Sequence, residues 1–311
     1  MAELNTNVTT SAGMKPELKT FYDMQLIENA KPVLVHNQFG QKRPIPKNEG
    51  KTINFRKFTA LPKATTPLTE GVTPDGRSIT VTEKTATVAQ YGDYITISDM
   101  LELSSPDPVV AENNKLLGAQ AGETLDAVTA AVLNAGTTVQ YVNGKESRAA
   151  LGSADLLTVN EIKKAVATLK NNKAKPIDGS FVAIVHPLVA YDLMSDPDWL
   201  DVKNYDPKDL YNGEIGKLYG VRFVETTEAK VFEKQGISSA NIYSTLVLGA
   251  NAYGVTEITG GGLKMIAKSK GSAGTADPLD QRSTQGWKAI HVAKILSEEY
   301  MVRIESGATL G

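Results

Sequence analysis

The sequence predicts an α+β fold, in which helices and strands dominate different parts of the chain. Three observations support this class. Residues 44–98 are rich in threonine and alternate as β-strands do, residues 107–136 carry the spacing of one long helix, and residues from about 151 onward mix short helices with buried strands. With 311 residues, 41% of them hydrophobic, the chain can form one large or two modest domains.

Composition excludes several classes of protein. The net charge is only −2 and no basic run is present, which argues against a protein that grips nucleic acid through its phosphates. The chain has no cysteine, so disulfides, thiolate metal sites and cysteine nucleophiles are excluded. No stretch approaches the ~20 apolar residues of a membrane helix, and the N-terminus lacks the pattern of a secretory signal. We therefore expect no membrane association.

The N-terminal region is expected to begin as a flexible arm, because the first 14 residues are small and polar. A short helix is predicted over residues 15–30. Pro16 suits its first turn, and Pro32 ends the pattern.

Residues 44–98 predict a long two-stranded ribbon. Residues 51–58 alternate as a strand, a connection rich in proline and glycine covers residues 61–78, and a second strand runs over residues 79–97, where Gly92 suggests a bulge. A ribbon that is polar on both faces is marginal in water by itself. Either a neighbouring subunit supports it, or it folds back on its own domain.

The longest helix is predicted to start at Asp107 as N-cap, with Pro108 in its first position, and to end at Gly136. One apolar face is indicated by Val110, Leu117, Ala121, Leu125, Val128 and Val132. About 28 residues at ~1.5 Å each give a rod of ~40 Å. Two glycines inside it, Gly118 and Gly122, indicate close packing against another element.

The second half of the chain predicts mixed α/β structure. Asn143-Gly144 is typical of a tight hairpin turn. Residues 158–170 predict an amphipathic helix with Thr158 and Glu161 as a capping box and with Glu161 on the solvent side. Residues 181–185 predict a buried strand, and Pro187 opens a short helix that ends at Met194.

The remaining segments are predicted in the same way. Strands are expected at residues 220–224 and 245–248, and residues 286–305 are expected to be mainly strand. Residues 260–262, three glycines, predict a flexible joint, and residues 268–285 predict a polar loop. The sequence contains no internal repeat.

Motifs for catalysis or metal binding are nearly absent. The three histidines, His36, His186 and His291, lie far apart with no partner at metal-ligand spacing. Residues 213–217 distantly resemble a phosphate loop, but Leu218 stands where a hydroxyl residue would hold magnesium. A turn before a strand is the alternative interpretation. His186, before Pro187, is interpreted as structural rather than catalytic.

One acidic cluster could bind calcium or could be a solvated loop. It consists of Asp196, Asp198, Asp201, Asp206 and Asp209. Its spacing does not match the helix-loop-helix calcium pattern, which favours the solvated loop. Trp199 and Tyr205 in the same region could be contact aromatics or loop anchors.

Five separated segments resemble the major capsid (coat) proteins of tailed double-stranded DNA bacteriophages. They are TPLTEGVTP at 66–74, QYGDYITISD at 90–99, FVAIVHP at 181–187, GEIGKLYGVRFV at 213–224, and DPLDQR at 277–282 leading to GWK at 286–288. The order of the predicted parts resembles the same family. The likeness covers essentially the whole chain.

The resemblance implies the tailed-phage major capsid fold. Its parts would be an N-terminal arm at 1–38, a β-ribbon extended loop at 39–98, a peripheral domain with a long spine helix at 99–150 and 277–311, and an α/β axial domain at 151–276. It implies a structural subunit, without enzyme activity, cofactor or metal, that self-assembles as hexamers and pentamers into an icosahedral shell. The shell would enclose double-stranded DNA without sequence-specific binding, in a virion assembled in the bacterial host cytoplasm.

The resemblance also implies partners and contacts. Portal, scaffolding and decoration proteins are further partners, and the short segment before Lys15 suggests a separate scaffolding protein or none. The expected subunit contacts are Arg56, Lys57, Glu70, Arg77, Tyr91 and Asp93, with Arg56 and Glu70 forming ion pairs between subunits. Some relatives cross-link Lys to Asn covalently, but no local motif here marks such a pair.

Three other functions compete with this one. An encapsulin, a bacterial compartment shell of the same fold, would need a cargo-binding arm. A hydrolase would need a carboxylate pair, but Glu298 and Glu299 are adjacent, and adjacent residues on a strand point to opposite faces. A tail-tube or other virion component is the third alternative.

Overall fold

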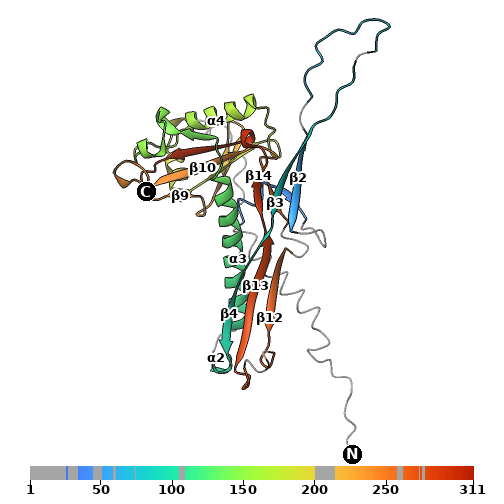
Figure 1. Cartoon of the computed structure of the whole chain (residues 1–311). Coiled ribbons are helices and arrows are strands. Elements are labelled where there is room, and N and C mark those ends of the chain that lie inside the picture. The colour runs from blue at the N-terminus through green and yellow to red at the C-terminus, as the bar shows by residue number, and fades with distance from the viewer. Residues whose placement is uncertain are drawn as a thin grey trace, which may run out of the picture.

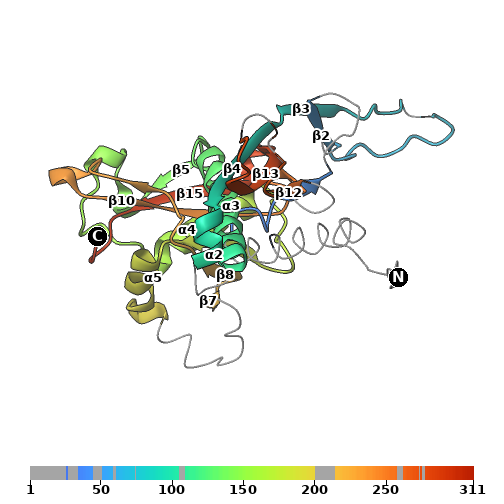
Figure 2. The ribbon, with the colours of Figure 1, turned by 90° about the horizontal axis from the view of Figure 1, so that it is seen from below.

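A computed structural model describes residues 26, 34–44, 51–58, 61–73, 75–104, 109–199, 214–257, 262–272, 274 and 277–311 of the chain. These residues form three parts, shown together in Figure 1. An α/β unit, called the body below, lies at one end of a long column made of a helix and a three-stranded sheet. A two-stranded ribbon leaves the place where body and column meet, and Figure 2 shows it pointing away from the body.

The body is built on a mixed sheet whose strands come from distant parts of the sequence. Its order is β5 (Val139–Tyr141), β15 (Met301–Ser306), β10 (Ile242–Leu248), β6 (Phe181–Val185), β8 (Val221–Glu225) and β7 (Glu214–Leu218), with β9 (Val231–Phe232) beside β10. Every residue of the two central strands, β6 and β10, is buried. A strand that is covered on two sides needs apolar side chains on both faces, and both of these strands are rich in them.

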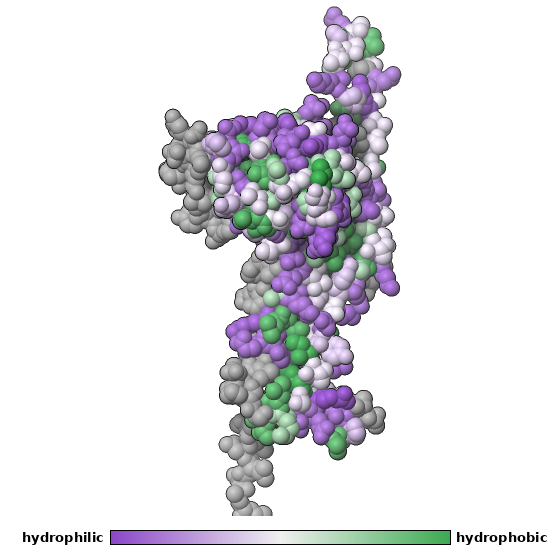
Figure 3. Space-filling view, turned by 90° about the vertical axis from the view of Figure 1, so that its left-hand side faces the viewer, coloured by the Kyte–Doolittle hydropathy of each residue, from purple (hydrophilic) through white to green (hydrophobic). Residues whose placement is uncertain are grey.

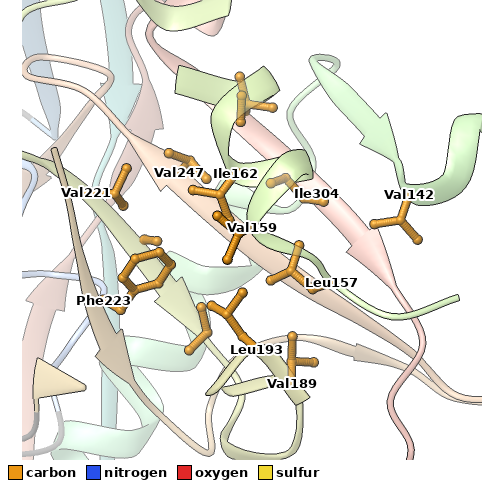
Figure 4. Packing of buried hydrophobic residues seen from close by; sticks show 14 of the residues in the cluster. Val142, Leu157, Val159, Ile162, Val189, Leu193, Val221, Phe223, Val247 and Ile304 are labelled. Atoms are coloured by element: carbon orange, nitrogen blue, oxygen red, sulfur yellow. The ribbon is translucent and has the colours of Figure 1, made fainter. Parts of the chain in front are cut away.

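Alternation along β6 divides the body core between the two faces of this sheet. Phe181 and Val185 belong to a large cluster with α4 (Val159–Asn171) and α5 (Pro187–Met194), part of which Figure 4 shows. Val182 belongs to a second cluster, which contains Leu133 at the end of the long helix. The sheet is thus the layer that joins the body to the column.

The column consists of the long helix and one sheet. Its elements are α2 (Asp99–Ser104), α3 (Val109–Leu133), β4 (Ala89–Ser98), β12 (Leu263–Lys268) and β13 (Arg282–His291), with strand order β12-β13-β4. Leu117, Ala121 and Leu125 of α3 pack with Trp287 of β13. The indole N–H of Trp287 also donates to the Gln120 side-chain oxygen at 3.0 Å. One face of the sheet is therefore covered by α3.

The prediction of the long helix is confirmed in its central face, where Leu117, Ala121 and Leu125 are buried. Its predicted N-cap, residues 107–108, lies outside the described residues. The bulge expected at Gly92 is wrong, because β4 and β13 pair without a register shift from Ala89 to Ser98. A Cβ at Gly92 would lie 2.6 Å from the Trp287 carbonyl oxygen. That glycine instead allows two strands to approach closely.

The ribbon is formed by β2 (Thr52–Phe58) and β3 (Val81–Thr87), paired antiparallel. Residues 61–73 and 75–80 lie beyond it without regular structure. The connection was predicted at 61–78, and the second strand starts at Val81 rather than at residue 79. The second predicted strand does not stay in the ribbon, because β4 leaves it to pair with β13. At the other end of the expected extended loop, β1 (Gln41–Arg43) pairs with β11 (Tyr253–Thr256), which in turn pairs with β14 (Ala293–Ile295).

The base of the ribbon is anchored by a small apolar cluster. Ile53, Phe55 and Ala86 of the ribbon pack there with Leu296. The Phe55 ring fills the space that a side chain at position 254 would need, which explains Gly254. The ribbon is therefore fixed at its base by its own chain, while its distal loop extends away from both other parts (Figure 1).

Several predictions in the body hold in part. Asn143 and Gly144 form a turn with positive φ, 55° and 66°, but no hairpin follows because β5 pairs in parallel with β15. Helix α4 starts where predicted, yet Thr158 makes no side-chain capping bond. Glu161, expected in solvent, is buried and binds the side chains of Gln140 and Lys164.

Other predictions are confirmed or shifted. The buried strand at 181–185 and the helix at 187–194 have the predicted limits. Residues 286–305 form strands as expected, and β15 lies in the body sheet. Residues 282–285 belong to β13 rather than to a loop. The helix at 15–30, except Leu26, and most of the joint at 260–262 lie outside the described residues. Short 3-10 turns occupy Val142–Gly144, Arg148–Ala150, Ile237–Ser239 and Glu298–Tyr300.

A buried polar network holds residues 34–40, the described end of the expected arm. The His36 backbone N–H donates to one Asp126 carboxylate oxygen at 2.7 Å, and His36 Nδ1 lies 2.6 Å from the other. Thr129 donates to Asn37 at 2.6 Å and lies 2.9 Å from His291 Nε2. These residues are buried, so this part of the expected N-terminal arm is fixed against the long helix. The flexible segment expected over the first 14 residues lies outside the described residues.

Acid is expected to destabilise the folded chain through His291 of this network. Burial lowers the pKa of His291 from 6.5 to about 4, since the charged ring loses water. Between these values the unfolded chain binds more protons, so the free energy of unfolding falls as the pH drops below about 6.5, by about 3 kcal/mol in all at pH 4. Urea titrations between pH 7 and pH 4 should show a shallower fall for His291→Gln. Equal slopes for both chains would contradict this assignment.

Candidate subunit interface

Two of the predicted contact residues on the ribbon already have partners in their own chain. Arg56 Nε lies 2.9 Å from a Glu83 carboxylate oxygen across the ribbon, and both side chains are largely exposed. Lys57 Nζ lies 5.0 Å from the centre of the Tyr300 ring. Exposed ion pairs contribute about 0–1 kcal/mol, so the Arg56 pair leaves that side chain available for exchange with another partner.

The other two ribbon residues, Glu70 and Arg77, lie in the distal loop and are exposed. Around them the loop exposes large apolar side chains, including Leu68 at 78% and Val72 at 61%. Scattered exposed leucines are ordinary, but an extended loop that carries several of them far from any core indicates a contact surface.

Tyr91 and Asp93 lie in the column, away from the loop. Tyr91 is half-buried against the cluster under α3. The Asp93 carboxylate accepts hydrogen bonds from the Gln120 side chain at 2.7 Å and from the Tyr94 backbone at 2.8 Å. These bonds, chiefly that of Gln120, lower the pKa of Asp93. The structure therefore does not bring the six predicted residues together into one site.

A surface that the sequence reasoning missed is the outer face of the column sheet, opposite α3. Tyr94 and Ile266 are exposed there, at 68% and 44%. A groove of about 760 Å³ runs over this region, and its lining includes Gly92 and Gly286. Period-two alternation places Tyr94 on the face opposite Tyr91, and this is the signal that could have identified it.

Apolar side chains are also exposed toward the far end of the column. They include Met100 at 65% and Leu103 at 83% on α2, and Leu116 at 63% on α3. Figure 3 shows a hydrophobic band along this end of the column, whereas the body surface above it is mostly polar. Unpaired apolar surface of this kind marks sites of protein association.

A comparison with known protein families identifies the family of the chain that carries these surfaces. The family model of phage capsid proteins matches residues 81–304. The chain belongs to the phage capsid protein family. The match covers the column strands, the long helix and nearly all of the body.

Solved structures show that the capsid protein has the fold predicted from its sequence. It is similar to the capsid of Ralstonia phage GP4, with a TM-score of 0.70, 14% identity and 88% of each chain covered. For the capsid of Cyanophage P-SCSP1u the TM-score is 0.66, with 15% identity and 88% of each chain covered. For a virus-like particle from Pyrococcus furiosus the TM-score is 0.55, with 10% identity, 93% of this chain and 99% of that chain covered. A search of curated proteins finds no match.

The residues suspected of binding a metal have structural partners where they are described. One Asp196 oxygen accepts from the Val159 backbone N–H at 3.0 Å, and Asp198 pairs with Lys163 at 2.9 Å. Among the described residues no cluster of three potential metal ligands occurs. Asp201, Asp206, Asp209 and Tyr205 lie outside the described residues. Trp199 is a loop anchor, since it is buried with its ring centre 5.1 Å from that of Phe223.

The candidate catalytic residues are also explained by packing. His186 Nδ1 accepts from the Leu188 backbone N–H at 3.2 Å at the start of α5, and burial lowers the pKa of this histidine. Glu298 lies in a 3-10 turn rather than on the predicted strand, and its carboxylate accepts from the Thr137 backbone N–H at 3.1 Å. Residues Glu214–Leu218, which overlap the suspected phosphate loop, form strand β7.

Within the described part of the chain, no helix is long and apolar enough to cross a bilayer.

Proposed function

We propose that this capsid protein is the shell subunit of a tailed phage and assembles with copies of itself into a closed icosahedral head around double-stranded DNA. The observation that carries the proposal is the family match over residues 81–304. The fold adds a physical reason, because the distal ribbon loop exposes apolar side chains that its own chain does not cover.

A contact between that loop and another copy would join two different surfaces of the same protein. Such contacts build closed rings when the rotation that relates one copy to the next returns to the first copy. Rings of this kind can tile a shell. Each contact can be weak, because a subunit in a closed shell holds several neighbours at once. A nearly neutral net charge of −2 also limits repulsion between densely packed copies.

Each part of the chain has a proposed place in the shell. The body would surround local five-fold and six-fold centres as the axial domain, and the column would form the peripheral domain. The limits differ from those expected from the sequence, because β5 and β15 belong to the body, whereas β4 and β12 belong to the column. The genome would be enclosed without sequence-specific binding, and the subunit would catalyse no reaction. Portal, scaffolding and decoration proteins are proposed partners, and assembly is proposed to take place in the host cytoplasm.

The first experiment is negative-stain microscopy with light scattering. The purified chain is examined alone and after co-expression with candidate scaffolding proteins. We expect closed shells or capsomer rings. A monomeric globule under both conditions would contradict the proposed function.

Removing the distal loop should abolish closed shells without unfolding the subunit. In the variant, Asn-Gly replaces residues 59–80, because Phe58 and Val81 are the last pair of the ribbon and a two-residue turn can close it. The described residues of the loop, 61–73 and 75–80, are all exposed, so the free energy of unfolding of the unassembled chain should stay within about 0.5 kcal/mol of the parent. Shells of normal yield and size from this variant would show that the loop makes no essential contact.

A further inference from the structure

One face of the ribbon is turned toward the rest of the molecule. Residues that lie directly opposite each other in an antiparallel pair share a face, and every second residue of a strand returns to it. The register therefore places three successive pairs on this face, Ile53–Ala86, Phe55–Lys84 and Lys57–Thr82. Ile53, Phe55 and Ala86 belong to the apolar cluster at the ribbon base. The face thus changes from apolar to basic along its length.

The two lysines of this face contact opposite ends of segment 295–300, which leads from β14 to β15. Lys57 Nζ lies 5.0 Å from the centre of the Tyr300 ring, and Lys84 Nζ donates a hydrogen bond to the Ile295 carbonyl oxygen at 3.4 Å. Both lysines are half-buried. A cation over an aromatic face is attracted by the electrons of the ring, and the attraction grows as water is excluded. Each lysine therefore holds the ribbon to residues outside it.

Segment 295–300 is a firm support for these contacts. The backbone N–H groups of residues 296–297 both donate to the Ala252 carbonyl oxygen, at 2.8 and 2.9 Å. The Tyr300 carbonyl oxygen accepts from the Gly249 N–H at 2.8 Å, and the Tyr300 side chain packs against both apolar clusters of the body. The segment therefore cannot follow a swinging ribbon, and a change of the ribbon angle breaks the lysine contacts.

The contacts of the ribbon are spaced so that together they define an angle. The Phe55 ring fills the space beside Gly254 and serves as the pivot. Lys57 lies two residues further out on the same strand, roughly 7 Å away, and Lys84 lies on the neighbouring strand, about 5 Å to the side. Three contacts that do not lie on one line fix the orientation of the ribbon, whereas the pivot alone would leave it free to swing.

The charged pair on the opposite face of the ribbon acts within the ribbon. Arg56 Nε lies 2.9 Å from a Glu83 carboxylate oxygen, and both side chains are largely exposed. This pair joins β2 to β3, so it stiffens the ribbon without setting its direction. Control of the angle therefore falls to Lys57 and Lys84.

We infer that Lys57 and Lys84 are positioning residues that set the angle at which the ribbon leaves the body, with Tyr300 and the Ile295 carbonyl oxygen as their supports. The role of this angle in assembly rests on the proposed function, in which the ribbon of one copy reaches another. The inference adds which side chains give the ribbon its direction before any such contact forms. Lys57, expected from the sequence to contact another subunit, then acts within its own chain.

A distance measurement on the unassembled chain tests the angle directly. Because the chain has no cysteine, nitroxide labels on Val81→Cys and Lys170→Cys attach only at these two positions. Val81 is 42% exposed at the outer end of the ribbon, and Lys170 is exposed on α4 in the body. Double electron–electron resonance then gives the distribution of the distance between the labels. Lys57→Met/Lys84→Met keeps side chains of similar length without charge and should widen that distribution at least about twofold, since a ribbon held only at its pivot samples more angles.

Three variants separate the proposed contacts from a general loss of packing. Lys57→Arg and Tyr300→Phe each keep a cation over an aromatic ring, so both should retain the width of the parent distribution. Arg56→Met is the matched control on the opposite face. It breaks the pair with Glu83 and should also retain the parent width.

A parent width in Lys57→Met/Lys84→Met would overturn the positioning role, and so would a Lys57→Arg distribution as wide as that expected for the double variant. Neither outcome depends on assembly, because the measurement uses the unassembled chain. If the parent chain forms no shells but the widths change as expected, the proposed function fails and the two lysines still set the ribbon angle. If shells form but the widths do not change, the proposed function stands and the positioning role fails.

Discussion

Replacing Glu305 by alanine is expected to destabilise the unassembled capsid protein by about 3–5 kcal/mol. Glu305 lies on β15 and its side chain is fully buried. Its two oxygens accept from Arg148 Nε and from a terminal Arg148 nitrogen, both at 2.7 Å, and Arg303 Nε lies 2.9 Å from it. Without Glu305, two guanidinium groups lose the charge that compensates them, and Arg303 is itself 9% exposed.

The loss should be measured by urea titration of the unassembled chain. The midpoint should fall at unchanged slope, which indicates a change in stability rather than in the unfolded state. Asp198→Ala removes an exposed pair with Lys163 and should cost less than about 1 kcal/mol, so it is the matched control. If Glu305→Ala cost no more than Asp198→Ala, the cluster around Glu305 would not stabilise the body.

Replacing Asp126 by alanine is expected to have an effect of similar size, about 3–5 kcal/mol, at the junction of column and body. One carboxylate oxygen accepts a hydrogen bond from the His36 backbone N–H, and the other lies 2.6 Å from His36 Nδ1. All of these groups are buried. Its removal leaves a buried backbone donor without an acceptor. Tyr253, whose hydroxyl donates to the His36 carbonyl, would lose a partner held in place by the same network.

Two measurements distinguish this effect from a general weakening of α3. Urea titration gives the total loss, and hydrogen exchange locates it, since amides at residues 34–40 should exchange much faster than those near Leu125. Glu123→Ala, an exposed position three residues earlier on the same helix, should change stability by less than about 0.5 kcal/mol. Uniform acceleration along the whole helix would refute a specific role for Asp126 in holding the N-terminal segment.

Local sequence patterns predicted much of the secondary structure. The apolar spacing at Leu117, Ala121 and Leu125 predicted the buried face of the long helix, and Pro187 marked the start of α5. These predictions hold because helix periodicity and proline restriction act over a few neighbouring residues. Burial of a polar residue was less predictable. Glu161 follows a solvent-side pattern, but Gln140 from another element approaches it and accommodates the buried carboxylate.

The candidate contact surface was only half predictable. Glu70 and Arg77 could be named from the sequence, because a polar ribbon rich in proline and glycine was predicted around them. The groove on the column sheet could not, since Ile266 and Gly286 in its lining are 20 residues apart in sequence and become neighbours only through the β12–β13 register. For Arg56, the sequence indicated a contact residue but not its partner within the chain. That partner, Glu83, lies on the opposite strand of the ribbon.

The sequence alone determined the α+β class, the positions of most helices and strands, and the likeness to tailed-phage coat proteins, all of which depend on local periodicity and on short motifs. Only the tertiary structure decided which strands pair. β4 continues from the ribbon strand β3 yet joins β13, and β5 lies parallel to β15 rather than forming a hairpin at Asn143-Gly144. The physical reason is that an alternating pattern specifies which face of a strand is buried, whereas its partner is chosen by packing between residues far apart in the chain.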